Sequence, residues 1–194
     1  MHLRISQGEK KGENLFVPNN IKPTKNVVKL AVFSMLGETV RNADCLDLYA
    51  GSGALGLSAL SLGAKSCTFV DKDISAINLI KRNAKNLDFE NRIIAVNTEA
   101  EKFLASSLPT KYDIVFADPP YKLTVDNLAQ KLLNCISEKG VIVYLHHRDA
   151  KINLEGLEVF RQRTYGKTGV SILKNASTKK ENKHIKKKPQ EEKY

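Results

Sequence analysis

The sequence has no long apolar run and few cysteines. None of its apolar runs approaches the roughly 18 residues of a membrane-spanning helix, and residues 1–12 lack the apolar core of a signal peptide. The three cysteines, Cys45, Cys67 and Cys135, form no C-x-x-C pair and no zinc-binding spacing. These absences argue against a membrane protein and a disulfide-stabilised secreted protein, and they predict a cytoplasmic location.

Two common catalytic arrangements are also missing. No Ser-His-Asp or Cys-His combination occurs together with a nucleophile-elbow motif. His146 and His147 are adjacent in a predicted strand, so they point to opposite faces, and no third metal ligand accompanies them. We therefore expect no hydrolase triad and no bound metal.

Positive charge is concentrated at the two ends of the chain. The formal net charge is +10. Residues 1–29 carry six basic residues against two acidic ones, and residues 175–194 carry seven lysines against three glutamates. A near-neutral middle with basic ends suits an enzyme core that approaches a polyanion such as a nucleic acid, although the same charge also serves solubility.

Strand-like and helix-like segments alternate along most of the chain. The apolar patterns predict strands at 45–49, 66–70, 92–96, 112–117 and 140–145, and helices at 24–36, 54–62, 75–87, 99–104 and 126–136. Short hairpins are expected at both ends, from 3–6 with 14–17 and from 158–165 with 169–174. This order predicts an α/β fold with a doubly wound, mostly parallel sheet, a small N-terminal β-hairpin and a C-terminal antiparallel hairpin.

The length of 194 residues favours one main domain. We place this domain at residues 24–174, after a basic N-terminal extension at residues 1–23. From 175 to 194 the apolar content collapses and lysines dominate, which predicts a disordered tail.

The segment D-L-Y-A-G-S-G-A-L-G, residues 47–56, ends in G-x-G-x-x-G between a predicted strand and a predicted helix. Glycines in such a turn let the backbone approach a ligand at a helix N-terminus. Asp71 follows the next predicted strand, where a carboxylate can accept both hydroxyls of a ribose. NAD and S-adenosylmethionine both present an adenosine to this arrangement, so these residues leave the ligand open.

A second segment, A-D-P-P-Y at residues 117–121, lies at the carboxyl end of a later strand, on the edge where open parallel sheets bind ligands. The two prolines lack N–H donors, so carbonyl oxygens stay available next to Asp118. These acceptors can hold the two hydrogens of an exocyclic nucleobase amine while Tyr121 stacks on the base. The segment therefore favours methyl transfer to an amine over hydride transfer with NAD.

D-P-P-Y is similar to the [DNS]-P-P-[YFW] motif of amino methyltransferases that use S-adenosylmethionine. Residues 2–174 as a whole resemble the bacterial RsmD-type family. The segments that carry this resemblance, besides D-P-P-Y, are R-I, G-E-K-K-G, L-F-V-P, K-P-T, the glycine turn and T-Y-G-K-T-G-V-S-I-L. That resemblance implies a Rossmann-like class I methyltransferase with a seven-stranded sheet and S-adenosyl-L-methionine as cofactor. It also implies methylation of a guanine N2 amine in 16S ribosomal RNA, either free or in an assembling 30S subunit. We expect a monomer.

The resemblance also assigns roles to individual residues. The target-amine site comprises Asp118, Pro119, Pro120 and Tyr121. The cofactor site, which joins the glycine turn, the ribose-binding acid and two residues near the adenine, comprises Asp47, Tyr49, Ala50, Gly51, Ser52, Gly53, Gly56, Asp71, Glu99 and Ala100. The residues of the N-terminal extension that are expected to orient RNA are Arg4, Lys10, Lys11 and Lys22.

Three other functions stay open from the sequence. A DNA adenine-N6 methyltransferase has a similar core, but this chain is small and shows no recognisable target-recognition domain. An NAD oxidoreductase uses the same kind of glycine turn, but no hydride-transfer partner is identifiable. A non-catalytic RNA-binding protein can keep the fold, although the intact Asp118 and glycine turn speak against it.

Overall fold

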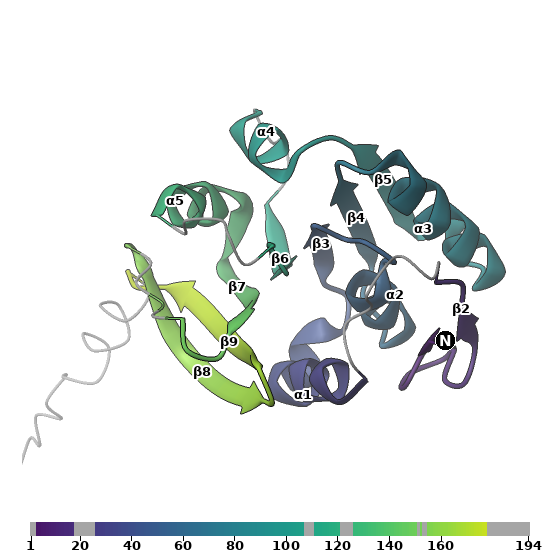
Figure 1. The fold of residues 1–194 in the computed structure, drawn as a ribbon, viewed down its shortest axis with the longest axis horizontal. Coiled ribbons are helices and arrows are strands. Elements are labelled where there is room, and N and C mark those ends of the chain that lie inside the picture. The colour runs from purple at the N-terminus through teal and green to yellow at the C-terminus, as the bar shows by residue number, and fades with distance from the viewer. Residues whose placement is uncertain are drawn as a thin grey trace, which may run out of the picture.

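A seven-stranded sheet forms the centre of the computed structural model (Figure 1). The structure describes residues 3–17, 26–106, 111–120, 126–150, 152 and 155–177. The strands follow one another in the order β5-β4-β3-β6-β7-β9-β8. Their bounds are β3 (Asp44–Leu48), β4 (Ser66–Asp71), β5 (Ile93–Asn97), β6 (Tyr112–Ala117), β7 (Ile136–His147), β8 (Leu157–Tyr165) and β9 (Thr168–Asn175). The strand order reverses between β3 and β6, which is where open α/β sheets bind ligands.

Strands β3 to β7 are parallel, and the last hairpin is antiparallel. β3 pairs in parallel with β4 and β6, β4 with β5, and β6 with β7. β9 is antiparallel to β7, and β8 is antiparallel to β9. A separate small sheet pairs β1 (Leu3–Arg4) with β2 (Asn14–Leu15). The predicted Rossmann-like, doubly wound sheet with a hairpin at each end is confirmed.

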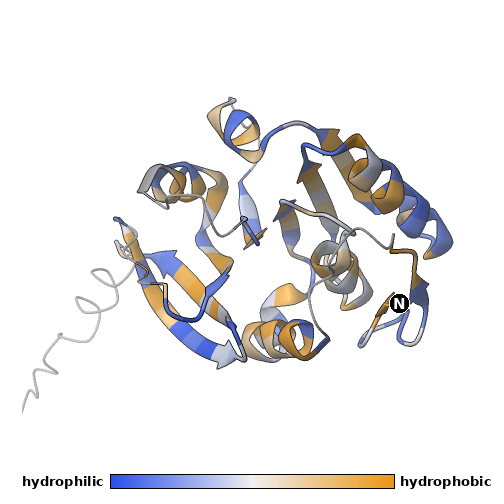
Figure 2. Cartoon of the chain, in the orientation of Figure 1, coloured by the Kyte–Doolittle hydropathy of each residue, from blue (hydrophilic) through white to orange (hydrophobic). Residues whose placement is uncertain are grey.

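Helices cover both faces of the sheet. Their bounds are α1 (Asn26–Leu36), α2 (Ala54–Ser61), α3 (Ile74–Asn86), α4 (Ala100–Ala105) and α5 (Asp126–Cys135), with 3₁₀ turns at Gly37–Val40 and Glu90–Arg92. Helices α1, α2 and α3 pack with Phe116 of β6 into one buried cluster. Helices α4 and α5 pack with Val115, the residue before Phe116, into a second cluster on the other face. Successive strand residues face opposite layers, so apolar residues of the inner strands contribute to both buried clusters; Figure 2 shows them among polar positions. None of the described helices is long and apolar enough to cross a bilayer.

The strand β8 differs from the inner strands because it ends the strand order. Most of its residues are exposed, among them Val159 and Phe160, whereas β9 is buried from Gly169 to Leu173. A register shift between Val159 and Arg161 introduces a bulge into the pairing with β9. The sheet therefore has an exposed, irregular edge on this side.

The largest difference from the predicted elements is at β7. The sequence predicts a helix through residue 136 and a strand from 140, whereas α5 ends at Cys135 and β7 begins at Ile136. The intervening S-E-K-G has the composition of a turn, but Ile136 pairs with Tyr112, and the Ser137 hydroxyl donates to Asp113 Oδ1 at 2.9 Å. A register shift between Tyr112 and Ile114 accommodates the extra strand residues.

The two predicted domain boundaries lie close to the limits of the described structure. Thr24, the predicted start of the first helix, lies outside the described residues, and α1 is described from Asn26. β9 extends to Asn175, and the Ala176 N–H donates to the Gly156 carbonyl at 3.0 Å. The rest of the lysine-rich segment, residues 178–194, lies outside the described residues, so its disorder stays a prediction.

Candidate active site

The turn between β3 and α2 adopts a backbone conformation that glycine favours. Gly51 and Gly53 have φ of 53° and 73°, and Tyr49 has φ of 57°. A side chain in this left-handed region costs about 1 to 2 kcal/mol, and glycine avoids that cost at two of the three positions. The Gly53 N–H donates to the Ala50 carbonyl at 2.7 Å, and the Ala50 N–H donates to the Val70 carbonyl at 3.1 Å, so the turn is held against β4.

The glycines of the motif serve different purposes. A Cβ atom on Gly56 would lie 2.4 Å from the Phe69 ring and 2.6 Å from Cys67 Sγ, so glycine allows α2 to pack closely against β4. A Cβ atom on Gly51 would meet no described atom nearer than 4.0 Å. Gly56 is therefore required by internal packing, whereas the open space at Gly51 leaves the backbone accessible to a ligand.

The carboxyl group of Asp47 is buried beneath this turn and supports it. Its Oδ2 accepts a hydrogen bond of 2.9 Å from the Gly56 N–H near the start of α2. Burial raises the pKa of Asp47 to about 8, the Gly56 hydrogen bond opposes that rise, and the charges of Asp118 and Asp71 add to it. The geometry gives Asp47 the role of positioning the glycine turn from below.

Asp71 ends β4 and joins the turn from the side. Its Oδ2 accepts from the Gly51 N–H at 2.8 Å, and its Oδ1 accepts from the Asp73 N–H at 2.9 Å. A carboxylate has about four lone-pair sites, so two of these bonds leave it able to accept from a ligand as well. The predicted acid at the end of the second parallel strand therefore lies directly beside the glycine turn.

The buried Asn83 of α3 connects this turn to the N-terminal segment. Its Oδ1 accepts from the Phe16 N–H at 2.8 Å, and its Nδ2 donates to the Phe16 carbonyl at 3.0 Å and to the Ser52 carbonyl at 3.4 Å. The side chain thus pairs with Phe16 as a strand backbone would. Asn83 was not predicted as a site residue, because it occupies an ordinary position of an amphipathic helix.

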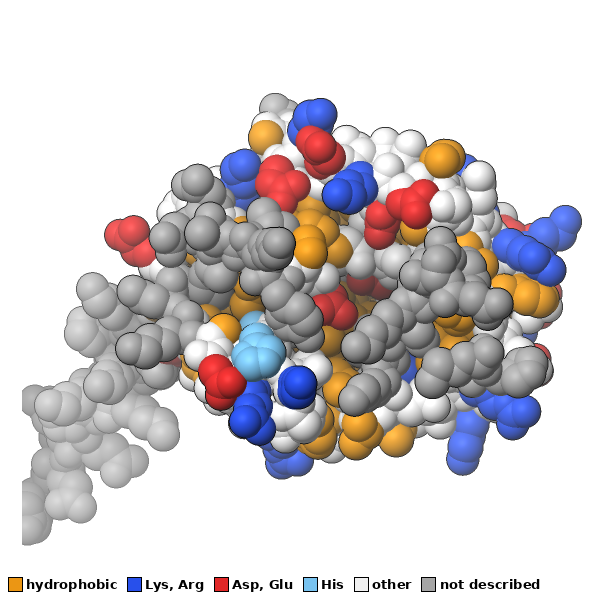
Figure 3. All heavy atoms as spheres, in the orientation of Figure 1, with side chains coloured by type: hydrophobic (Ala, Val, Ile, Leu, Met, Phe, Trp, Pro, Cys, Tyr) orange, Lys and Arg blue, Asp and Glu red, His pale blue; other side chains and the backbone are white. Residues whose placement is uncertain are grey.

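A pocket of about 570 Å³ opens at the carboxyl edge of the sheet, a size typical of small-ligand sites. Figure 3 shows the hollowed middle of this face, with acidic side chains around it. The predicted site residues that line the pocket are Tyr49, Asp71, Glu99, Ala100 and Pro120. The sequence reasoning missed Val70, Lys72 and Glu101, which also line it. Val70 and Lys72 flank Asp71, so their position beside that acid would have been enough to find them.

Tyr49 and Glu101 meet across one side of this pocket. The Tyr49 hydroxyl donates to Glu101 Oε1 at 2.8 Å. Burial and this hydrogen bond both raise the pKa of Tyr49, so the phenol keeps its proton. Glu99, which precedes α4, forms an exposed ion pair of 3.0 Å with Lys102 of the same helix.

Asp118 directly follows β6 and stands next to the same pocket. Its neighbour Pro119 is buried, and Pro120 is exposed and lines the pocket. Burial is the largest cause of the raised pKa of Asp47, under the glycine turn, and of Tyr144 in β7. The charge of Asp118 raises both pKa values further, so Asp118 lies near both residues. Asp118 and the two prolines thus lie at the same sheet edge as the glycine turn and Asp71, while Tyr121 lies outside the described residues.

His146 serves the packing of β7 and β9. Its ring stacks on Tyr144 with 5.8 Å between centroids, its Nδ1 lies 2.7 Å from the His147 carbonyl oxygen, and its Nε2 lies 3.0 Å from Ser171 Oγ. A carbonyl oxygen only accepts, so Nδ1 donates to it, and Nε2 shares the second hydrogen bond with the serine hydroxyl. Within the described residues, no cluster of three or more His, Cys, Asp or Glu side chains is suited to hold a metal ion.

The basic residues of the N-terminal extension lie in several different surroundings. Lys10 Nζ lies 2.7 Å from Asp88 Oδ2, and its backbone N–H donates to Ser61 Oγ at 3.0 Å. Ser61 ends α2 on the edge of the sheet opposite the pocket, because α2 leads back from the carboxyl end of β3 to the start of β4. Arg4 donates to Asn14 Oδ1 within the hairpin, and Lys11 is exposed. Lys22 lies outside the described residues.

Lys29 of α1 is a buried cation that the sequence did not reveal. Only 1% of its surface is exposed, and its Nζ donates to the Arg4 carbonyl at 3.0 Å. Burial lowers the pKa of Lys29 to about 8. Lys29 therefore ties α1 to the N-terminal hairpin and contributes no surface charge.

Comparison with known proteins places this chain among methyltransferases. The family model described as "Conserved hypothetical protein 95" matches residues 3–174. The "Putative rRNA methyltransferase YlbH" of Bacillus subtilis is 36% identical over 184 residues, covering 89% of this chain and 98% of that protein. The "Ribosomal RNA small subunit methyltransferase D" of Escherichia coli is 35% identical over 140 residues, covering 71% of this chain and 68% of that protein. A solved structure described as "Putative methyltransferase yhhF" from Escherichia coli superposes with a TM-score of 0.81 at 27% identity, covering 90% and 98% of the two chains.

Proposed function

This chain belongs to the family described as Conserved hypothetical protein 95 and is an RsmD-type methyltransferase. From that premise we propose that it methylates the exocyclic N2 amine of a guanine in 16S ribosomal RNA. The methyl donor in this proposal is S-adenosyl-L-methionine. The observation that carries the proposal is the position of Pro120 and Asp71 in the walls of one pocket. This supports the proposal, because a target amine held near Pro120 would lie within reach of an adenosine held by Asp71.

The residues of the pocket fit S-adenosylmethionine. The open backbone at Gly51 allows a close approach, Asp71 has acceptor sites for the ribose hydroxyls, and Glu99 and Ala100 line the wall where an adenine would lie. The charges of Asp71 and Asp118 give this edge a negative potential that complements a sulfonium cation. When bound, the cofactor supplies a methyl group attached to a sulfonium sulfur, and that sulfur becomes a neutral thioether once the methyl group has been transferred.

In this proposal, Asp118 and the Pro119 carbonyl accept the two hydrogens of the target amine. Guanine N2 is a poor nucleophile, because its lone pair is delocalised into the ring. Two acceptors raise the electron density on the nitrogen and fix its direction of attack. The nitrogen forms the new N–C bond and loses one proton, which passes to Asp118 or to water.

The target base must leave its stack to enter this site. Extrusion of a base costs a few kcal/mol and costs least where pairing is already absent. A loop or bulge of RNA is therefore a more accessible substrate than a regular duplex. The names of the two relatives given above favour ribosomal RNA over DNA as the substrate, which would place the activity in the cytoplasm.

Tritiated S-adenosylmethionine, incubated with the protein and with 30S subunits, 16S RNA or DNA, tests the proposal. We expect label in RNA alone, recovered as N2-methylguanosine after digestion to nucleosides. Label in DNA as N6-methyladenine would replace the proposal with the alternative of a DNA methyltransferase. Tight binding of NADH, with no binding of the methyl donor in calorimetry, would reject the methyl-transfer assignment as a whole.

Two variants separate the amine site from the cofactor site. Asp118→Ala should abolish most methyl transfer and leave the affinity for S-adenosylmethionine nearly unchanged. Asp71→Ala should weaken that affinity about ten-fold or more, because a hydrogen bond to a charged group contributes roughly 1.5 to 3 kcal/mol. Wild-type turnover by Asp118→Ala on RNA would contradict the proposed role of this residue.

A further inference from the structure

A group of exposed cations lies on the C-terminal hairpin, away from the N-terminal extension. Arg163 of β8, Lys167 in the β8–β9 turn and Arg148 directly after β7 form this group, which we call the C-terminal basic flank. The Arg148 N–H donates to the Lys167 carbonyl at 3.0 Å, so the loop after β7 and the hairpin turn lie side by side. The flank is therefore built from two segments of the chain, which meet at Arg148 and Lys167.

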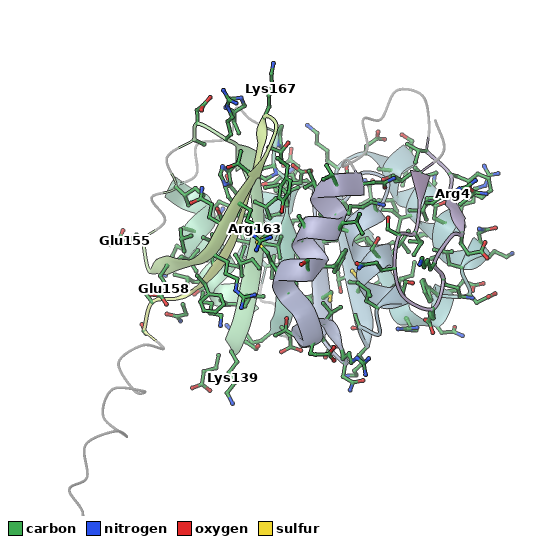
Figure 4. The ribbon with its side chains drawn as sticks, turned by 90° about the horizontal axis from the view of Figure 1, so that it is seen from below. Arg4, Lys139, Glu155, Glu158, Arg163 and Lys167 are labelled. Atoms are coloured by element: carbon green, nitrogen blue, oxygen red, sulfur yellow. The ribbon has the colours of Figure 1, made fainter. Side chains whose placement is uncertain are left out.

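Arg148 and Lys167 lie at the same sheet edge as the proposed amine site, and Arg163 lies further along β8 (Figure 4). Ala117, which precedes Asp118, pairs with Tyr144, and β7 continues only three residues further to His147. β7 and β9 are paired without interruption from Ile142 to His147, which fixes the hairpin turn relative to this edge. Figure 4 shows Lys167 at the opposite end of the sheet from Lys139, which lies near the start of β7.

Charge is distributed unevenly along this hairpin. Arg163 and Lys167 are exposed, whereas Glu155 and Glu158 lie at the other end of β8 (Figure 4). Arg148 has an exposed ion pair of 3.4 Å with Asp149, a kind of contact that binds weakly and exchanges readily. The part of the hairpin toward the amine site thus has Arg148, Arg163 and Lys167 against Asp149, whereas Glu155 and Glu158 lie with Lys174 at its far end.

We infer that the C-terminal basic flank binds phosphates of the RNA strand beside the target base. This inference rests on the proposed RNA substrate. Phosphate contacts fix the position of a nucleic acid without reading its sequence, and guanidinium groups suit phosphate oxygens through paired N–H donors. A rigid flank next to Asp118 holds the strand on one side while the extruded base occupies the site.

The test compares a flank variant, Arg148→Gln/Arg163→Gln/Lys167→Gln, with a control that removes the same charge from the opposite edge. The control is Lys65→Gln/Lys111→Gln/Lys139→Gln, whose positions lie at the starts of β4, β6 and β7. Binding of an unmodified 16S RNA transcript is measured over a range of salt concentrations, together with the steady-state kinetics of methylation. Melting temperatures establish that both variants fold.

The flank variant should bind RNA more weakly at low salt, and its log–log salt slope should fall by about two to three, at roughly 0.7 to 0.9 per phosphate contact. The KM for RNA should rise, whereas kcat and the cofactor affinity should stay nearly unchanged. The control should resemble the wild type. If the wild type methylates RNA and the flank variant keeps its slope and KM, the inference is wrong. If the wild type transfers no methyl group to RNA, the proposed function itself has failed.

Discussion

The hairpin β1–β2 and the hairpin β8–β9 both carry basic residues, yet they use this charge differently. In the first hairpin Lys10 pairs with Asp88 at 2.7 Å, and Glu9 pairs with Arg92 at 2.9 Å. In the second, Arg163 and Lys167 face solvent. Formal charge in a sequence therefore does not measure the charge available to a ligand, because acidic partners from distant elements can fold against it.

The apolar residues of the two hairpins show the same contrast. Leu3, Ile5 and Leu15 of the first hairpin are part of the main buried cluster. Val159 and Phe160 of β8 are 45% and 48% exposed. The N-terminal hairpin is thus part of the core of the domain, whereas β8 forms the outer edge of the sheet.

The largest expected effect is on stability, from truncation of a buried side chain in the first hairpin. Ile5→Ala should lower the free energy of unfolding by about 2 to 5 kcal/mol, because Ile5 is 1% exposed. Val159→Ala in β8 should change it by less than about 0.5 kcal/mol. Urea denaturation of both variants measures the difference, and equal losses would show that the two hairpins contribute alike to the core.

The buried Lys29 should make the contact between α1 and the first hairpin depend on pH. Its pKa is about 8 in the folded chain against 10.5 ordinarily, so between these values the unfolded chain binds a proton that the folded chain has released. The free energy of unfolding of the wild type, relative to Lys29→Met, should therefore rise by about 3 kcal/mol from pH 8 to 10.5 and be constant below pH 8.

Urea denaturation of the wild type and Lys29→Met at a series of pH values measures this difference. Subtracting the two curves removes the titration of groups that both proteins share. A difference that stays constant across the whole range would mean that Lys29 is more hydrated than its burial indicates.

A smaller effect is expected where α3 holds the segment that follows β2. Asn83→Ala leaves the Phe16 N–H without its present acceptor, so the free energy of unfolding should fall by about 1 to 3 kcal/mol. Asn86→Ala is the matched control, since Asn86 is exposed on the same helix and donates to Asn14 over 3.5 Å. Similar values for the two variants would contradict the anchoring role of Asn83.

The smallest effect should come from Lys10. Lys10→Gln removes a cation that already pairs with Asp88 on the edge opposite the pocket, so the salt slope of RNA binding should not change. Lys167→Gln should lower that slope by roughly 0.7 to 0.9. A lower slope for Lys10→Gln would support the prediction that Lys10 of the N-terminal extension orients RNA.

The sequence was sufficient to place the glycine turn, Asp71 and the A-D-P-P segment at one edge of the sheet. This prediction needs only the order of strands and helices, because the carboxyl ends of parallel strands converge at one edge. The order of strands and helices did not predict Glu101 as a site residue. Its hydrogen bond to Tyr49 depends on how α4 is oriented and on the unusual backbone angle at Tyr49.

Buried polar residues were the second kind of feature that the sequence could not reveal. Lys29 and Asn83 interact with backbone atoms 25 and 67 residues away, and nothing in their local pattern indicates this. Lys10 reaches Asp88 across 78 residues. Hydrophobic periodicity assigns such residues to a solvated face, because it has no information about distant acceptors.

The contacts of the first hairpin have a consequence for the order in which the chain matures during its own synthesis. The hairpin leaves the ribosome before Ser61, Asn83 and Arg92, which hold it and follow their partners by 51, 67 and 83 residues. At roughly 5 to 20 residues per second, the longest of these delays, that of Arg92, is on the order of 4 to 17 seconds. During that interval the cluster that buries Leu3, Ile5 and Leu15 is incomplete, so the nascent chain exposes part of their apolar surface until β5 has been made.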